Sequence, residues 1–142
     1  MKVLVLDGVS EKAIAILREN GIQADVSPAL PLPELVAKIP EYEGVIVRSQ
    51  TKVTAEVIEA GAKLKVIGRA GVGVDNVDVE AATKRGIVVM NAPDGNTIST
   101  AEHTIAMIMA LSRNIPQAHC SLKAGQWDRK SFTGVEVNNK VL

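Results

Sequence analysis

The amino-acid sequence predicts an α/β fold: a flavodoxin-like, doubly wound sheet of five parallel strands. Short apolar segments rich in β-branched residues alternate with helix-like segments from residue 2 to residue 90. Strands that are apolar throughout are typical of parallel sheets, because both faces of such sheets are covered. A chain of 142 residues is long enough for one such domain with a hydrophobic core. The predicted strands cover residues 2–6, 22–26, 44–47, 64–67 and 87–90.

The segments between the predicted strands carry signals for the beginning or the end of a helix. Ser10 is a favourable N-cap for the first helix, and Asn20-Gly21 is a typical end. Pro33 fits the first turn of the second helix, and Gly86 ends the fourth. The predicted helices cover residues 10–20, 33–39, 54–60 and 79–85.

The pattern changes after residue 90, and we expect a second structural part there. Residues 91–96 are rich in turn formers, and Ser99-Thr100-Ala101-Glu102 fits a capping box at the start of a helix. Pro116 limits that helix near Arg113. The predicted parts are a domain over residues 1–96, and a helix followed by an arm over residues 97–142.

The helix after residue 96 requires a partner surface. Residues 105–111 are apolar on every side of the helix, and one small domain cannot cover all of them. Residues 117–138 are more polar, and we expect them to form an irregular arm that packs on a partner. The sequence therefore predicts a homodimer formed through residues 97–138.

Composition and charge narrow the functional class. The 16 basic and 16 acidic side chains cancel and form no basic stripe, so we expect no nucleic-acid partner. The longest apolar run, residues 105–111, falls far short of the roughly 20 residues of a membrane span. The single cysteine, Cys120, fits a reducing compartment, and we expect a cytoplasmic protein without membrane contact. His119 beside Cys120 has no further ligand nearby, so we expect no metal site.

The most informative segment is the glycine turn, Gly68-Arg69-Ala70-Gly71-Val72-Gly73, which follows the fourth predicted strand. Glycine lets the backbone approach a ligand closely, and ligands of open α/β sheets bind beyond the carboxyl ends of strands. Arg69 adds a fixed positive charge with a planar set of donors. The third glycine of the dinucleotide fingerprint is absent, since Asn76 stands there. These residues predict a site for a small anionic ligand.

Several segments together resemble the D-isomer-specific 2-hydroxyacid dehydrogenases. The resemblance lies in residues 45–54, 68–78, 89–96, 101–103 and 126–130, which occur in the family's order and at its spacings. It covers essentially the whole chain. It implies that residues 1–96 are a substrate-binding domain and that residues 97–142 are a crossover helix and arm at the start of an NAD-binding domain.

The resemblance implies hydride transfer between NAD and a small phosphorylated 2-hydroxy acid. The family's G-x-G-x-x-G turn, catalytic histidine, paired glutamate and catalytic arginine have no counterpart here. We therefore assign no catalytic residue and expect this chain to be inactive by itself. Val72 is implied to contact the cofactor, at a position where relatives often carry threonine. The implied substrate-binding residues are Arg48, Ser49, Arg69, Gly71 and Asn96.

The sequence leaves two alternative functions open. The first is another enzyme of the same family, such as a glyoxylate or hydroxypyruvate reductase, whose singly charged substrate needs one arginine. The second is a non-enzymatic flavodoxin-like binding module. Residues 7–12 are a poor phosphate loop for a flavin, and Arg48 stands where a phosphoacceptor receiver needs an aspartate.

Overall fold

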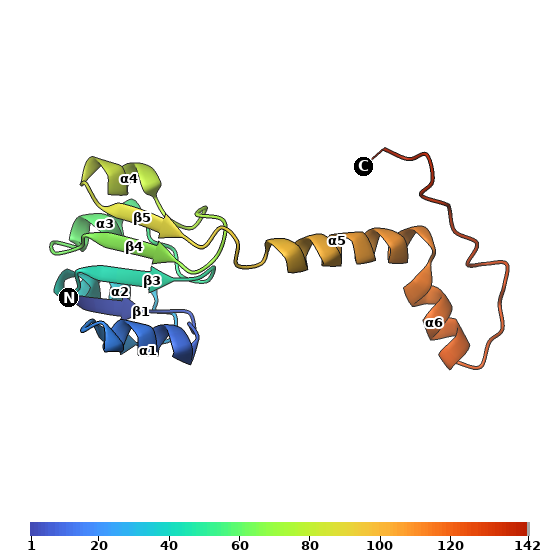
Figure 1. Cartoon of the computed structure of the whole chain (residues 1–142), viewed down its shortest axis with the longest axis horizontal. Helices are drawn as coiled ribbons and strands as arrows, with labels where there is room; N and C mark the ends of the chain where they lie inside the picture. Colours follow the sequence, from blue (N-terminus) through green and yellow to red (C-terminus); the bar gives the residue numbers. More distant parts are fainter. Residues whose placement is uncertain (142) are drawn as a thin grey trace. The chain divides into compact units, whose positions relative to one another are not determined.

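A computed structural model describes residues 1–141, and Leu142, the last residue of the expected arm, lies outside the described residues. Residues 2–91 form a sheet of five parallel strands in the order β2-β1-β3-β4-β5, which confirms the predicted flavodoxin-like fold (Figure 1). The strands are β1 (Lys2–Val5), β2 (Gln23–Val26), β3 (Gly44–Val47), β4 (Val66–Arg69) and β5 (Val88–Asn91).

Helices follow the strands in alternation, close to the predicted ranges. Ser10 caps α1 as predicted, because its hydroxyl accepts a hydrogen bond from Ala13 N at 3.3 Å. Asp78 caps α4 in the same way, through Ala81 N at 2.9 Å. The helices between the strands are α1 (Glu11–Glu19), α2 (Leu32–Lys38), the 3₁₀ turn η1 (Ile39–Glu41), α3 (Ala55–Ala60) and α4 (Val79–Lys84).

The two faces of the sheet are covered unequally. Leu4, Val45 and Ile67 pair across three strands and belong to the larger core cluster, which also holds buried residues of α2, α3 and α4. On the other face, Val3 and Val5 pack with Ile14 of α1 in a smaller cluster. Figure 1 shows α1 beside β1, with β4 and β5 left bare on that face.

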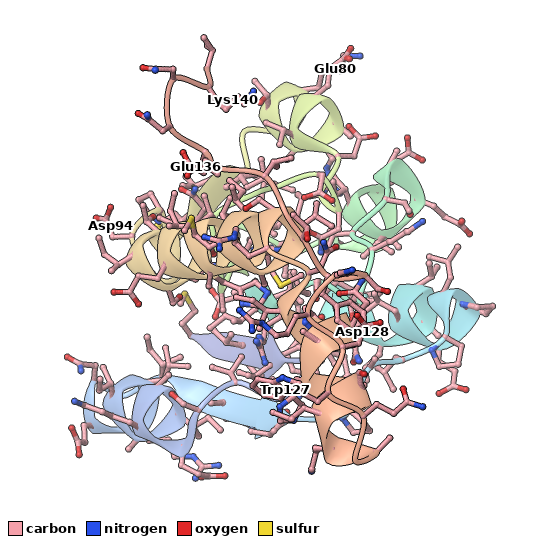
Figure 2. The ribbon with its side chains drawn as sticks, turned by 90° about the vertical axis from the view of Figure 1, so that its right-hand side faces the viewer. Glu80, Asp94, Trp127, Asp128, Glu136 and Lys140 are labelled. Atoms are coloured by element: carbon pink, nitrogen blue, oxygen red, sulfur yellow. The ribbon has the colours of Figure 1, made fainter. Side chains whose placement is uncertain are left out.

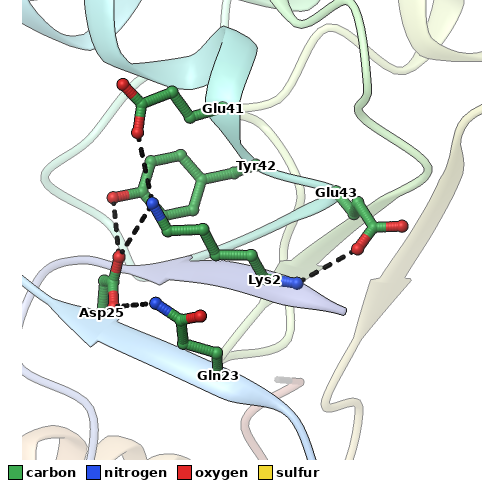
Figure 3. A network of polar contacts seen from close by, with 6 residues as sticks. All are labelled: Lys2, Gln23, Asp25, Glu41, Tyr42 and Glu43. Atoms are coloured by element: carbon green, nitrogen blue, oxygen red, sulfur yellow. Dashed lines mark hydrogen bonds and ion pairs between the residues drawn. The ribbon is translucent and has the colours of Figure 1, made fainter.

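A polar network holds the amino-terminal edge of the sheet together (Figure 3). The Lys2 ammonium lies 3.2 Å from Glu41 Oε2 and 3.4 Å from Asp25 Oδ2, and 4.5 Å from the centre of the Tyr42 ring. The Tyr42 hydroxyl donates to Asp25 Oδ2 at 3.0 Å. Hydrogen bonds from Gln23, Tyr42 and Lys2 lower the pKa of Asp25, because they stabilise its carboxylate.

The chain divides into two compact units, Met1–Gly95 and Asn96–Leu142. The second unit contains α5 (Thr97–Ser112) and α6 (Ile115–Lys123). The predicted capping box is wrong, because α5 already begins at Thr97 with Asn96 as its N-cap, and the Ser99 hydroxyl donates to the Asn96 carbonyl at 3.1 Å.

The prediction of an irregular arm over residues 117–138 is also wrong for its first part, which lies in α6. Pro116 stands in the first turn of α6, where its missing N–H is no loss. Asn114 permits the new start, since its φ of 52° turns the chain between the two helices.

Helix α5 has no buried residue within its unit. The side chains of Ile105 and Leu111 are 52% and 76% exposed, although both are strongly apolar. Trp127, on the segment after α6, is 78% exposed (Figure 2). Within residues 1–141, no helix has both the length and the apolar character that a membrane crossing requires.

Candidate functional site

The predicted site residues of the first unit lie at the carboxyl ends of β3 and β4. Parallel strands end at a common edge, where open α/β sheets bind their ligands. Val47 pairs with Arg69 in the sheet, so the segments that follow these two residues leave the sheet side by side. The segment after β1, which begins at Leu6, runs along the other side of β3.

We call residues 48–51 the arginine loop. Arg48 and Ser49 are exposed, and their side chains form no hydrogen bond or ion pair with any other residue in the described range 1–141. Thr51, at the other end of the loop, is 4% exposed. The loop thus presents an arginine and a serine to solvent from a buried anchor.

Asp7 binds the arginine loop from the side of β1. Its Oδ2 accepts hydrogen bonds from Arg48 N and Thr51 N, both at 2.9 Å, and its Oδ1 accepts one from the Thr51 hydroxyl at 2.5 Å. Partial burial alone raises the pKa of Asp7, but the hydrogen bonds from Thr51 and from the loop backbone outweigh it and lower the pKa. Asp7 is therefore held as a carboxylate at neutral pH.

Asn76 binds the same loop from the side of the glycine turn. Its Nδ2 donates to the carbonyl of Arg48 at 2.7 Å and to the carbonyl of Thr51 at 2.6 Å. Val53 pairs with Val77 in an isolated bridge just beyond these contacts. Asn76, the residue that breaks the dinucleotide fingerprint, thus connects the arginine loop with the glycine turn.

Arg69 is the last residue of β4, and not part of the turn as the sequence predicts. The ladder continues through Gly68 and Arg69, because both pair with β3 and β5. The Arg69 guanidinium lies directly against Gly71, where an added Cβ would overlap Nη1. Its Nε is buried and has no hydrogen-bond partner within residues 1–141.

The glycine turn is fastened to the end of β5. Ala92 N donates to the carbonyl of Gly71 at 2.9 Å, and Asn91 Nδ2 donates to the carbonyl of Val72 at 2.7 Å. The Val72 side chain is 40% exposed. Both carbonyl oxygens are thus used inside the protein, and the side chain of Val72 remains partly exposed to solvent.

Asn96 differs from the other predicted site residues, because it belongs to the second unit. There it is the N-cap of α5, and its carbonyl accepts hydrogen bonds from Thr100 N at 2.9 Å and from the Ser99 hydroxyl. Its side chain makes no cap hydrogen bond. The structure thus brings Arg48, Ser49, Arg69, Gly71 and Val72 to one edge of the first unit, and shows Asn96 as a helix-capping residue.

A groove of about 340 Å³ lies between α1 and the bare face of the sheet. Apart from Arg69 and Asn91, the residues that line it are apolar or small, among them Leu17, Ile46 and Met90. Such a lining offers little to a phosphate or a carboxylate. The charged side chains Arg48 and Arg69 instead lie at the carboxyl edge of the sheet. Within residues 1–141, no three His, Cys, Asp or Glu side chains gather into a group that could hold a metal ion.

Sequence reasoning missed Asp7, Thr51 and the bridging role of Asn76. A signal for Asp7 exists, because Asp-Gly directly after a strand is typical of a chain reversal in the left-handed region. Asp7 and Gly8 indeed have φ angles of 63° and 69°. The partners of Asp7 lie 41 and 44 residues away, and no local pattern identifies contacts at that separation.

The fold and the site together define a domain of the doubly wound α/β class, with cationic side chains at the carboxyl edge of its sheet. Residues 3–138 match the family model of the D-isomer specific 2-hydroxyacid dehydrogenase catalytic domain, and the chain belongs to this family.

Relatives and solved structures agree with the family assignment. A D-3-phosphoglycerate dehydrogenase of Archaeoglobus fulgidus is 58% identical over 99% of this chain and 27% of its own length. The enzyme of the same name from Methanocaldococcus jannaschii is 56% identical over 100% of this chain, again covering 27% of its length. The NAD⁺-bound 3-phosphoglycerate dehydrogenase of Entamoeba histolytica superposes with a TM-score of 0.71 at 37% identity, over 80% of this chain and 39% of that one. The chain thus spans about a quarter of the length of the two curated relatives from Archaeoglobus fulgidus and Methanocaldococcus jannaschii.

Proposed function

We propose that this chain is the substrate-binding part of an NAD-dependent D-3-phosphoglycerate dehydrogenase. The reaction oxidises C2 of 3-phosphoglycerate to give 3-phosphohydroxypyruvate, the entry to serine biosynthesis. Family membership and the names of the relatives support the activity. The observation that carries the substrate is the pair Arg48 and Arg69 on adjacent strand ends, because a doubly anionic acid requires two separate cationic groups.

Of the two arginines, Arg69 gives the stronger evidence for an anion-binding site. Its buried Nε donor has no partner within residues 1–141, and an unpaired buried donor costs about 1–3 kcal/mol. A carboxylate or phosphate bound beside Arg69 gains hydrogen bonds from its guanidinium, which is charged and carries donors beyond Nε. Glycine at position 71 leaves the space that the guanidinium occupies.

NAD, when bound, supplies the hydride acceptor, and this chain contributes binding and orientation. The exposed side chain of Val72 and its N–H, which donates no hydrogen bond within residues 1–141, fit a contact with the nicotinamide half of the cofactor. No residue of this chain matches the family's proton-transfer pair, so we expect no dehydrogenase turnover from the chain alone.

The test is a calorimetric titration of the chain with 3-phosphoglycerate and, separately, with unphosphorylated glycerate. We expect 3-phosphoglycerate to bind more tightly, and Arg48→Ala and Arg69→Ala each to weaken its binding by about tenfold or more. Arg18→Ala is the matched control, because Arg18 lies near the end of α1, which runs back towards the amino edge of the sheet. Equal affinity for the two acids would favour a reductase of singly charged substrates. Wild-type affinity in both arginine variants would contradict the proposed site.

We also propose that the chain forms a homodimer through residues 97–138. The apolar side chains of α5 are exposed within their unit, and contiguous apolar surface of this kind is characteristic of protein interfaces. Light scattering that shows a monomer at high concentration would contradict this proposal.

A further inference from the structure

We propose that Asp7 and Asn76 are positioning residues, which clamp the arginine loop from two sides and set Arg48 for substrate binding. This inference rests on the proposed function, in which Arg48 binds an anionic group of the substrate. Neither residue belongs to the substrate-binding set that the family resemblance implies, and both act through the backbone of the loop.

The clamp holds both ends of the loop and leaves its middle open. At Arg48, Asp7 accepts the N–H and Asn76 donates to the carbonyl. At Thr51, Asp7 accepts a hydrogen bond from the N–H at 2.9 Å, and Asn76 donates one to the carbonyl at 2.6 Å. The Thr51 hydroxyl adds a fifth hydrogen bond, to Asp7.

Asp7 reaches the loop because of an unusual backbone conformation. Its φ of 63° lies in the left-handed region, which costs energy for most residues and is tolerated best by glycine, asparagine and aspartate. Asp7 adopts this conformation, and its carboxylate binds the arginine loop, which follows the neighbouring strand β3. The hydrogen bonds also lower the pKa of Asp7, so its carboxyl group is ionised at neutral pH.

Asn76 also binds the arginine loop at an energetic cost, because one of its polar atoms is left without a hydrogen bond in the described part of the chain. Both of its donated hydrogen bonds go to the arginine loop, while its Oδ1 is buried without a partner within residues 1–141. An asparagine that served only its own turn would use its oxygen on a nearby N–H, as in an Asx turn. The amide group of Asn76 therefore serves the arginine loop rather than its own turn.

A fixed loop affects binding because a mobile loop loses conformational entropy when it closes on a ligand. Holding Arg48 in its bound geometry removes part of that cost, so the clamp increases affinity without touching the ligand. Two clamped ends also fix the direction in which the arginine leaves the sheet edge.

The test is a double-mutant cycle on ligand affinity. Asp7→Gly removes the carboxylate and keeps the left-handed backbone accessible, and we combine it with Arg48→Ala. Affinity for 3-phosphoglycerate is measured by calorimetry in all four proteins, below their unfolding temperatures. Amide hydrogen exchange at Arg48 and Thr51, followed by NMR, reports on the loop without ligand. Asp25→Asn is the control, because Asp25 also accepts several hydrogen bonds but lies in the network around Lys2.

We expect Asp7→Gly to weaken binding about tenfold when Arg48 is present, and by less than about twofold in the Arg48→Ala background. Exchange at both amides should accelerate, and Asp7→Asn should restore much of the affinity because it keeps an acceptor oxygen. If Asp7→Gly fails to fold, Asn76→Ala replaces it in the cycle with the same expected coupling.

Two results would overturn the inference alone: wild-type affinity in Asp7→Gly, or an equal loss of affinity with and without Arg48. Wild-type affinity in Arg48→Ala has a different meaning. It would overturn the proposed substrate site at Arg48, and the clamp's role in binding with it. The failures are distinguishable because the single Arg48→Ala protein reports on the site and the cycle reports on the clamp.

Discussion

Replacing Gly71 by alanine tests whether the position of the Arg69 guanidinium matters for binding. The added Cβ would overlap Arg69 Nη1 and would lie 2.8 Å from Cζ. Contacts between such heavy atoms are favourable at about 3.5–4.0 Å, so the guanidinium has to move by more than about 1 Å. A misplacement of about 1 Å in a positioning group can cost on the order of 100-fold in rate, and we expect at least about tenfold in affinity.

Stability should change little or rise in the same variant. The overlapping atoms belong to the end of a flexible side chain, and the hydrogen bonds from Gly71 N to Arg69 O and from Ala92 N to Gly71 O involve only backbone. Alanine also restricts the unfolded chain, which stabilises a protein by about 0.4–1 kcal/mol where the backbone permits it.

The assay pairs calorimetric titration with 3-phosphoglycerate and thermal unfolding of the same samples. Gly68→Ala is the matched control, because its Cβ would meet the Ile46 side chain at an ordinary 3.5 Å. Gly71→Ala should add no further loss in an Arg69→Ala background. Wild-type affinity in Gly71→Ala, with the fold intact, would refute the argument that Arg69 must lie where the structure has it.

Three further predictions concern stability and assembly. The lowered pKa of Asp7 means that its carboxylate stabilises the fold above the unfolded-state pKa near 3.8, and that this contribution is lost as the pH falls through the folded-state pKa. Urea unfolding of wild type and Asp7→Asn should therefore differ most at neutral pH and converge in acid; a constant difference would contradict this. Tyr42→Phe should cost about 1 kcal/mol by denaturant unfolding, since it removes the hydroxyl bond to Asp25 but keeps the buried ring. Ile105→Asp should weaken association in sedimentation experiments while the circular dichroism spectrum is unchanged, because Ile105 is exposed within its unit; loss of helix signal would assign the side chain to the core.

The order of elements follows from local pattern, and the site depends on contacts that no local pattern encodes. Apolar runs such as Gly44–Val47 and the helix-capping residue Ser10 identify their elements, because the spacing and the cap are properties of neighbouring residues. Errors arise where tertiary structure decides. Arg69 joins β4 because ladders on both sides extend the strand past the apolar run.

The predicted end of α5 near Arg113 is confirmed, and the error lies in the irregular arm expected where α6 stands. Pro116 predicts an end to one helix, and the same residue opens the next, since proline is favourable in a first turn. The site residues Arg48 and Arg69 could be inferred from family resemblance and strand position. Asp7 and Asn76 could not, because their significance is a set of hydrogen bonds across 25 to 44 residues of sequence.

Because the glycine turn is attached to the end of β5, the structure of the site depends on the local stability of that strand. In the described part of the chain, β5 alone among the strands has no buried residue. Elements with few buried apolar side chains unfold locally at a lower free energy than the core does. When β5 detaches, the turn loses the support of Asn91 and Ala92 while β1 and β3 are still intact. Among the strands of the sheet, a protease should therefore cleave β5 first, and an acid bound at the turn should delay the cut.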